Sequence, residues 1–288
     1  MSLKEKIKST KFIVTSEVGP PKGIDIKETL DDAELIKGRV DGINVTDLQS
    51  SVMRLGSLAM CKMLKDRGHE PIFQITCRDR NRLALQSDIL SAAVFGIENI
   101  LALTGDHTTS GDHPQAKPVF DLDSVQLLEA IKTLQSGSDM AGGPLKGTPR
   151  FCVGAVVNPG AEPLEPELIK LDKKINAGAE FFQTQAVYDI EKFKKFMDKI
   201  KNLNIVIIAG IVLLKSAGMA RFMNKNVAGV FVPDNLIEEI DKASDKQAKS
   251  VEIAARLIKE LKPLCRGMHI MPIGWDKLVP RVLDAANL

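Results

Sequence analysis

Aromatic residues are scarce in this chain: they make up 5% of its 288 residues and include one Trp and one Tyr. A broad aromatic stacking surface is therefore not expected. The net charge of +2 is too small to indicate binding to nucleic acid or to a membrane surface. No apolar run approaches the roughly 20 residues that cross a membrane, and the first residues lack the apolar core of a signal peptide. These absences predict a cytoplasmic protein without a membrane span.

The four cysteines are scattered, and no two of them form a Cys-x-x-Cys pair. This spacing argues against a disulfide framework and a zinc site, and it favours reduced thiols. His107 and His113 do not have metal-ligand spacing with Asp112, so we interpret them as loop residues and expect no metal site. A Gly-x-Gly-x-x-Gly motif is also missing, which disfavours a dinucleotide-binding fold of the Rossmann type.

The chain does contain eight short apolar segments rich in Val, Ile and Phe. Apolar and polar residues alternate only weakly within these segments, as is typical of strands that are covered on both faces. We predict strands at Phe12–Val18, Val40–Thr46, Pro71–Thr76, Asn99–Leu103, Phe151–Val157, Glu180–Gln185, Ile205–Gly210 and Gly267–Ile273.

Amphipathic segments separate these strands. In residues 189–203, for example, Phe193, Phe196 and Ile200 share one helical face, and the intervening lysines face solvent. Strand and helix that alternate eight times predict a single (β/α)8 barrel over residues 1–288, because parallel strands need crossover helices. A doubly wound open sheet is the alternative. The loose segment 136–150 is expected at the face of the barrel away from the chemistry.

Polar residues gather near the carboxyl ends of the predicted strands, where barrels place their active sites. Inward-facing polar groups cost free energy unless they are paired, so their accumulation at one end favours a ligand cavity. They are Glu17 on the first strand, Asn44, Thr46 and Asp47 on the second, Gln74 and Thr76 on the third, Thr104 to His107 after the fourth, Asn158 after the fifth, Gln183 and Gln185 on the sixth, and His269 on the eighth.

Several of these residues also have a purely structural interpretation. Glu17 could pair with Lys22, although its place before a rigid Gly-Pro-Pro-Lys-Gly turn suits a proton donor. For that role its pKa would need to rise by burial. Asp106 follows Gly105, and Gly-Asp pairs are common in turns. A salt-bridged surface cluster at the start of a helix is the preferred interpretation for most of Arg78, Asp79, Arg80 and Arg82.

Six segments occur in order along the chain: TSEVGPPKG, INVTD, QITCRDRNR, NILALTGDH, KKINAGAEFFQTQAVYD and AGIVLL. Each segment alone is weak evidence for a family. The six segments, however, follow one another in a fixed order with barrel-like spacing, and they cover nearly the whole sequence. Together they resemble the methylenetetrahydrofolate reductase family, in its short bacterial form. The resemblance implies a (β/α)8 barrel that holds FAD and reduces 5,10-methylenetetrahydrofolate to 5-methyltetrahydrofolate.

The resemblance also implies roles for individual residues. Glu17 matches the acid that assists opening of the bridged folate ring, Asp106 matches a carboxylate beside flavin and folate, and Gln185 matches a pterin contact. The long loop from Asp106 to Asp121 would line the phosphate or adenine end of the cofactor. The positions expected around the flavin are Thr46, Gln74, Thr104, Gly105, Asp106 and Lys174.

The chain departs from the family pattern at three places. Val18 and Gly19 stand where aromatic residues are usual, Gln74 where His is frequent, and Thr104 where Arg is usual. These positions surround the flavin and the nicotinamide, so the electron donor is open between NADH, NADPH and a partner protein. FMN is the alternative to FAD, and a homo- or hetero-oligomer is expected.

Two other functions stay open: a flavin-free pterin-binding methyltransferase, and a subunit that depends on a partner for electrons.

Overall fold

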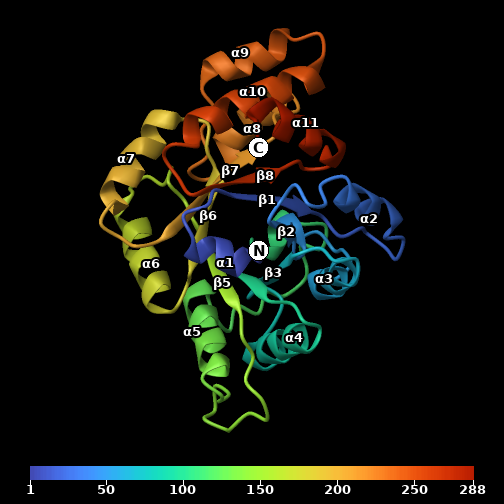
Figure 1. The fold of residues 1–288 in the computed structure, drawn as a ribbon, viewed down its shortest axis with the longest axis vertical. Coiled ribbons are helices and arrows are strands. Elements are labelled where there is room, and N and C mark those ends of the chain that lie inside the picture. The colour runs from blue at the N-terminus through green and yellow to red at the C-terminus, as the bar shows by residue number, and fades with distance from the viewer.

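Eight parallel strands form a closed barrel in the structure, a computed structural model that describes all 288 residues (Figure 1). The strands follow chain order around the barrel, and β1 pairs with β8 to close it. This topology confirms the predicted (β/α)8 barrel, and the alternative of an open sheet is wrong. The strands are β1 (Ile13–Val18), β2 (Gly42–Val45), β3 (Pro71–Thr76), β4 (Asn99–Leu103), β5 (Cys152–Val157), β6 (Phe181–Ala186), β7 (Val206–Val212) and β8 (Gly267–Met271).

Helices follow each strand and surround the barrel (Figure 1). Most connections contain one α-helix, whereas three lie between β7 and β8. None of the helices combines the length and the apolar character that a membrane span requires. The α-helices are α1 (Leu3–Lys8), α2 (Lys27–Glu34), α3 (Ser57–Asp66), α4 (Arg82–Val94), α5 (Ser124–Gln135), α6 (Glu165–Asn176), α7 (Ile190–Ile200), α8 (Ala217–Asn226), α9 (Asp234–Lys242), α10 (Lys246–Leu261) and α11 (Val279–Ala286), and the 3-10 helices are η1 (Gln49–Ser51), η2 (Thr108–Ser110) and η3 (Asp276–Leu278).

Every predicted strand is present: β3 and β4 have the expected bounds, and the other strands differ from theirs by at most two residues at either end. The segment 136–150 runs from α5 to β5, and it therefore begins at the amino-end face of the barrel, as predicted. It folds against a neighbouring helix, because the backbone N–H of Met140 donates a hydrogen bond to Gln86 Oε1 of α4.

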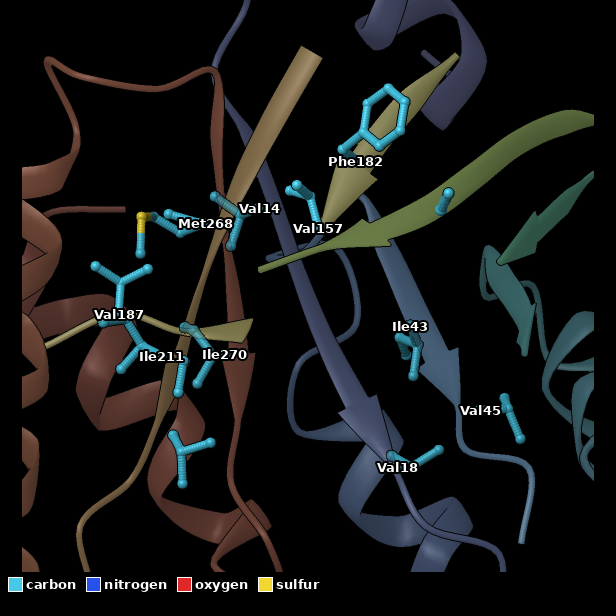
Figure 2. Packing of buried hydrophobic residues seen from close by; sticks show 14 of the residues in the cluster. Val14, Val18, Ile43, Val45, Val157, Phe182, Val187, Ile211, Met268 and Ile270 are labelled. Atoms are coloured by element: carbon cyan, nitrogen blue, oxygen red, sulfur yellow. The ribbon is translucent and has the colours of Figure 1, made fainter. Parts of the chain in front are cut away.

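Alternation along the strands directs half of their side chains outward, against the helices. Val14, Ile43 and Phe182 belong to this outward set and contribute to the large apolar core between barrel and helices (Figure 2). The apolar stripe of α7, with Phe193 and Phe196, is buried in the same core, as the helical spacing predicted. Burial of these side chains stabilises the fold by roughly 25 cal/mol for each Å² of apolar surface removed from water.

The inward set begins with an apolar floor at the amino ends of the strands. Leu3 and Ile7 of α1 form one cluster there with Ile13, Ile72 and Phe181. α1 thus lies across the end of the barrel, and Figure 1 shows it inside the ring of strands. The floor closes this end, so a ligand can approach the barrel interior only from the carboxyl ends of the strands.

Gly154 on β5 tests this packing. A Cβ atom at this position would lie 2.3 Å from Cζ of Phe181, whose side chain is fully buried. Gly154→Ala is therefore expected to lower the free energy of unfolding by about 1–3 kcal/mol through overpacking. Urea denaturation measures the change. Gly218→Ala is the matched control: this glycine is exposed near the start of α8, and alanine there should stabilise by up to about 1 kcal/mol through its higher helix propensity. A Gly154→Ala protein as stable as the wild type would contradict the placement of Phe181.

Candidate functional site

A polar layer lies above the apolar floor, and its side chains are hydrogen-bonded to one another across the barrel. Asn44 Nδ2 donates to Gln183 Oε1 at 2.7 Å, and Gln183 Nε2 donates to Asn44 Oδ1 at 3.1 Å and to Thr15 Oγ1 at 3.3 Å. Thr15 Oγ1 also lies 2.9 Å from His269 Nδ1. Asn44 and Gln183 therefore satisfy each other inside the core and are not available to a ligand.

This layer orients His269 toward Glu17. Because Thr15 Oγ1 accepts from Gln183, its own proton can be donated to His269 Nδ1, and we assign the ring proton to Nε2 on that basis. Nε2 lies 3.6 Å from Glu17 Oε2. Glu17 is 7% exposed, and no hydrogen bond reaches its carboxylate. This buried carboxyl group is the candidate proton donor of the site.

Glu17 also lines a cavity of about 670 Å³ between the end of β1, α2 and the segment that follows β8. Asp32 of α2, Asp276 of η3 and Trp275 line the same cavity. Burial raises the pKa of Asp276 to about 6, and it also raises the pKa of Asp32. Asp32 Oδ1 is buried without a hydrogen-bond partner. The cavity is therefore acidic, and it reaches the buried side of the candidate acid.

The mouth of the barrel beside β2 to β4 contains a different set of groups. Thr46 follows β2, is 2% exposed, and its Oγ1 has no hydrogen-bond partner. Gly105 follows β4 with φ of +92°, and a Cβ there would lie 3.1 Å from the Cβ atoms of Thr76 and Arg78. Glycine is therefore required where the backbone turns over this part of the mouth. A bound polar ligand would satisfy the unpaired, buried hydroxyl of Thr46, which lies 3.8 Å from the position that a Cβ atom at Gly19 would take.

In the cluster before α4, Arg78 is buried and Arg80 is half-buried, so the interpretation as a surface cluster is wrong for these two arginines. Arg78 is 1% exposed, pairs with Asp79, and donates hydrogen bonds to the carbonyl oxygens of Leu48 and Asp106. The reason is that these two loops leave backbone carbonyls inside the fold, and a guanidinium has enough donors to satisfy both. Arg82, which pairs with Asp121, is exposed as expected.

Arg80 pairs with the buried carboxylate of Asp47. Its Nη1 lies 2.7 Å from Asp47 Oδ2, and Asp47 also accepts hydrogen bonds from Ser57 Oγ and from the backbone and side chain of Thr76. Arg80 also pairs with Asp88 of α4. These contacts join β2, β3, α3 and α4, so Asp47 has a structural role and is not free for chemistry.

An open groove of about 820 Å³ begins at Thr104 and runs between α5 and α6. Phe120 and Leu122, at the end of the long loop after β4, line its upper part. Thr104 Oγ1 accepts a hydrogen bond from the backbone N–H of Ser124. The loop thus contacts the start of α5 and leaves an elongated space outside the barrel mouth, large enough for part of an extended cofactor.

Lys174 of α6 is buried, and its amine donates a hydrogen bond to the carbonyl oxygen of Val156 on β5. Burial lowers the pKa of this amine to about 8. The amine is therefore desolvated at the carboxyl half of β5. A phosphate group that reached it would restore a partner for its charge.

Asp106, Gln74 and Gln185 make no side-chain hydrogen bonds, whereas Asn158 Nδ2 donates to the carbonyl oxygen of Ala228 and His107 Nδ1 lies 2.9 Å from Thr109 Oγ1. Asp106 is exposed, and Gln74 points into the barrel from β3. Gln185 is half-buried and lies in an irregular stretch of β6, where the register with β7 shifts. His107 and His113 are exposed, and no cluster of metal ligands is present.

Sequence reasoning missed two features of this region. Asp32 and Asp276 were not among the candidates, because they lie on a helix and a 3-10 helix that only the fold brings together. A useful signal was available for Asp276, since it follows the last strand, where barrel loops carry functional groups. Arg78 gave no such signal, because a run of alternating Arg and Asp normally indicates a solvated surface.

The whole chain matches one family model: residues 2–287 align with the model described as methylenetetrahydrofolate reductase. The chain belongs to the methylenetetrahydrofolate reductase family. Among other members of the methylenetetrahydrofolate reductase family, it is 26% identical to methylenetetrahydrofolate reductase 2 of Schizosaccharomyces pombe over 257 residues, which are 81% of this chain and 38% of that protein. It is 24% identical to 5,10-methylenetetrahydrofolate reductase of Escherichia coli over 86% of this chain and 80% of that one. The chain thus spans about two fifths of the fission-yeast relative and most of the bacterial one.

Solved structures agree on the fold. A protein from Clostridium thermocellum superposes with a TM-score of 0.63 and 19% identity, over 99% of this chain and 98% of that one. A 2,3-dimethylmalate lyase superposes with a TM-score of 0.55 and 13% identity, over 99% of this chain and 82% of that one. At these identities the comparison supports the barrel and nothing finer.

Lys174 gives a test of the buried amine. Its pKa of about 8 in the folded chain lies below its ordinary value of 10.5, so between these pH values the unfolded chain binds more protons. Its contribution to the free energy of unfolding should therefore rise with pH from about 8 to 10.5, by up to about 1.4 kcal/mol per pH unit. Lys174→Met should lose this rise, as measured by urea denaturation at several pH values. The exposed neighbour Lys173→Met is the control and should follow the wild-type curve. Identical curves for Lys174→Met and the wild type would contradict a desolvated amine.

Proposed function

We propose that this chain reduces 5,10-methylenetetrahydrofolate to 5-methyltetrahydrofolate, with Glu17 as the general acid. The observation that carries the proposal is the Glu17 carboxyl group, buried at the barrel mouth, free of hydrogen bonds and faced by His269. The family match supports the reaction class. The Clostridium thermocellum neighbour is described as binding two copies of 5-methyl-5,6,7,8-tetrahydrofolic acid, which supports a folate in the same fold.

In this proposal Glu17 donates its proton to N10 of the substrate. The bond from N10 to the bridging carbon breaks, and the carbon stays on N5 as an iminium cation. Asp106, exposed at the mouth after β4, supplies a negative charge that stabilises this cation. Gln185 at the end of β6 is the proposed pterin contact. His269, held by Thr15, positions the Glu17 carboxyl group.

We infer that a flavin, FAD in preference to FMN, is the resident cofactor. The orphaned hydroxyl of Thr46, the close backbone turn at Gly105 and the desolvated amine of Lys174 fit such a group. Gln74, Thr104 and Asp106 complete the proposed contacts at the mouth. When bound, the reduced flavin supplies the hydride that converts the iminium carbon into a methyl group. The protein contributes position, charge and the proton.

The electron donor is proposed to be either a reduced nicotinamide or a partner protein. The family's aromatic residues after the acid are replaced here by Val18 and Gly19, which leaves no stacking surface for a nicotinamide at that point. Phe182 on β6 is buried in the core and offers no stacking surface either. These observations favour a partner subunit that brings electrons, and hence a hetero-oligomer.

The visible absorption spectrum of the purified protein tests the proposal first. We expect a flavin spectrum that bleaches when methyltetrahydrofolate is added without oxygen, because the reaction can run backward. Chromatography of the released cofactor then separates FAD from FMN. A colourless protein that cannot be reconstituted with either flavin would overturn the reductase proposal and favour a flavin-free pterin methyltransferase.

Glu17→Gln tests the acid separately from the cofactor. Glutamine keeps the size of the side chain but cannot release a proton, so the rate of folate reduction should fall by at least about a hundredfold. Flavin content and flavin reduction by dithionite should stay at wild-type levels, since Glu17 is not among the proposed flavin contacts. Normal turnover by this variant would remove Glu17 from the mechanism.

A further inference from the structure

We propose that Asp276, together with Asp32, passes protons from solvent to Glu17 through the acidic cavity beside β1. The inference rests on the proposed function, in which Glu17 releases one proton in each turnover and must recover it. Asp276 acts through Glu17 in this role and contacts no substrate atom.

The position of Glu17 creates the need for such a route. Its side chain is 7% exposed at the barrel mouth, so little solvent reaches it directly. The other proposed folate and flavin contacts lie on β2 to β6 or directly after these strands, and on α6. The cavity of about 670 Å³ extends from Glu17 toward α2 and η3, and Gln49 and Arg54 after β2 also line it. Glu17 can thus release its proton toward the proposed folate contacts and recover one through the cavity.

The carboxyl groups of the cavity are arranged for proton transfer. Asp276 on η3 and Asp32 on α2 both line it, and Asp32 Oδ1 is buried without a partner. A polar space of this size holds water that can connect the three carboxyl groups. The charged groups that face Asp276 are Asp32 and Glu17, both acidic, and Lys215 after β7. Lys277, next to Asp276, faces Asp32.

The pKa of Asp276 also supports its role in proton transfer to Glu17. Burial raises the pKa of Asp276 to about 6, and the neighbouring charges of Asp32 and Glu17 add to this effect. At neutral pH such a group is populated in both its protonated and ionised forms, which is the condition for an efficient relay. In the transfer, the O–H bond of Asp276 breaks, a water molecule carries the proton, and a new O–H bond forms on the Glu17 carboxylate. Asp276 then takes a proton from solvent, so each turnover consumes one solvent proton and no electrons move in this step.

Asp276→Asn tests the relay by kinetics on the flavin-loaded protein. Asparagine cannot carry a proton, so folate reduction at pH 8 should fall by about tenfold or more, with a smaller loss at pH 5.5, where hydronium is more abundant. Added imidazole should restore the rate at pH 8, and Asp276→Glu should retain it. Asp31→Asn, which removes an exposed charge outside the cavity, is the control and should behave as the wild type. If the rate of folate reduction by Asp276→Asn varies with pH in parallel with the wild-type rate, and imidazole does not restore it, the relay is overturned.

A titration without substrate gives an independent readout. Carbon-13 NMR of the Asp276 carboxyl group should give a pKa near 6, and Glu17→Gln should lower it, because one of the facing negative charges is removed. An unchanged value in Glu17→Gln would show that the two groups are not coupled, and it would overturn the relay. Wild-type protein that holds flavin but never reduces folate would instead overturn the proposed function. Wild-type turnover with an unaltered Asp276→Asn variant would overturn the relay alone.

Discussion

Closure of the barrel is the constraint on which the rest of the structure depends. Because β1 pairs with β8, the sheet has no free edge, and every inward side chain is confined to the narrow interior of the barrel. The polarity of the inward side chains therefore changes along the barrel axis, from the amino ends to the carboxyl ends of the strands. Apolar side chains and α1 fill the floor, and Asn44 and Gln183 satisfy each other above it. Near the carboxyl ends, the carboxyl group of Glu17 and the hydroxyl group of Thr46 lack hydrogen-bond partners. These two groups are at the level that a ligand can reach.

Much of this arrangement could be predicted from the sequence. Eight apolar segments with amphipathic stretches between them specified the number of strands, their order and the end that carries polar residues. The pairing inside the barrel could not be predicted, because it depends on which residues of β2 and β6 face each other at the same height. Asn44 and Gln183 therefore looked like ligand contacts before the fold showed them bonded to each other. The roles of Glu17, Asp106 and Gln185 came from the family resemblance, and they stay predictions.

Arg78 shows why local sequence was misleading in one place. Its neighbours Asp79 and Arg80 suggest a solvated surface, yet the turn at Gly105 and the loop at Leu48 both close over its side chain. Leu48, Ser50 and Ser51 have left-handed backbone angles, which are costly for residues other than glycine. The hydrogen bond from Arg78 to the Leu48 carbonyl oxygen ties this strained loop to the mouth of the barrel. Residues that contact no ligand thus fix the backbone around the proposed flavin position.

The floor made by α1 has a consequence for the order in which the chain folds. Leu3 and Ile7 leave the ribosome well before their partners, which include Phe181 of β6 and Ile208 of β7. The helix α1 therefore cannot reach its final place until β6 and β7 have been synthesised. Contacts between residues so far apart in sequence slow folding. Until then the apolar face of α1 stays exposed, and the nascent chain must avoid aggregation with an unfilled barrel floor.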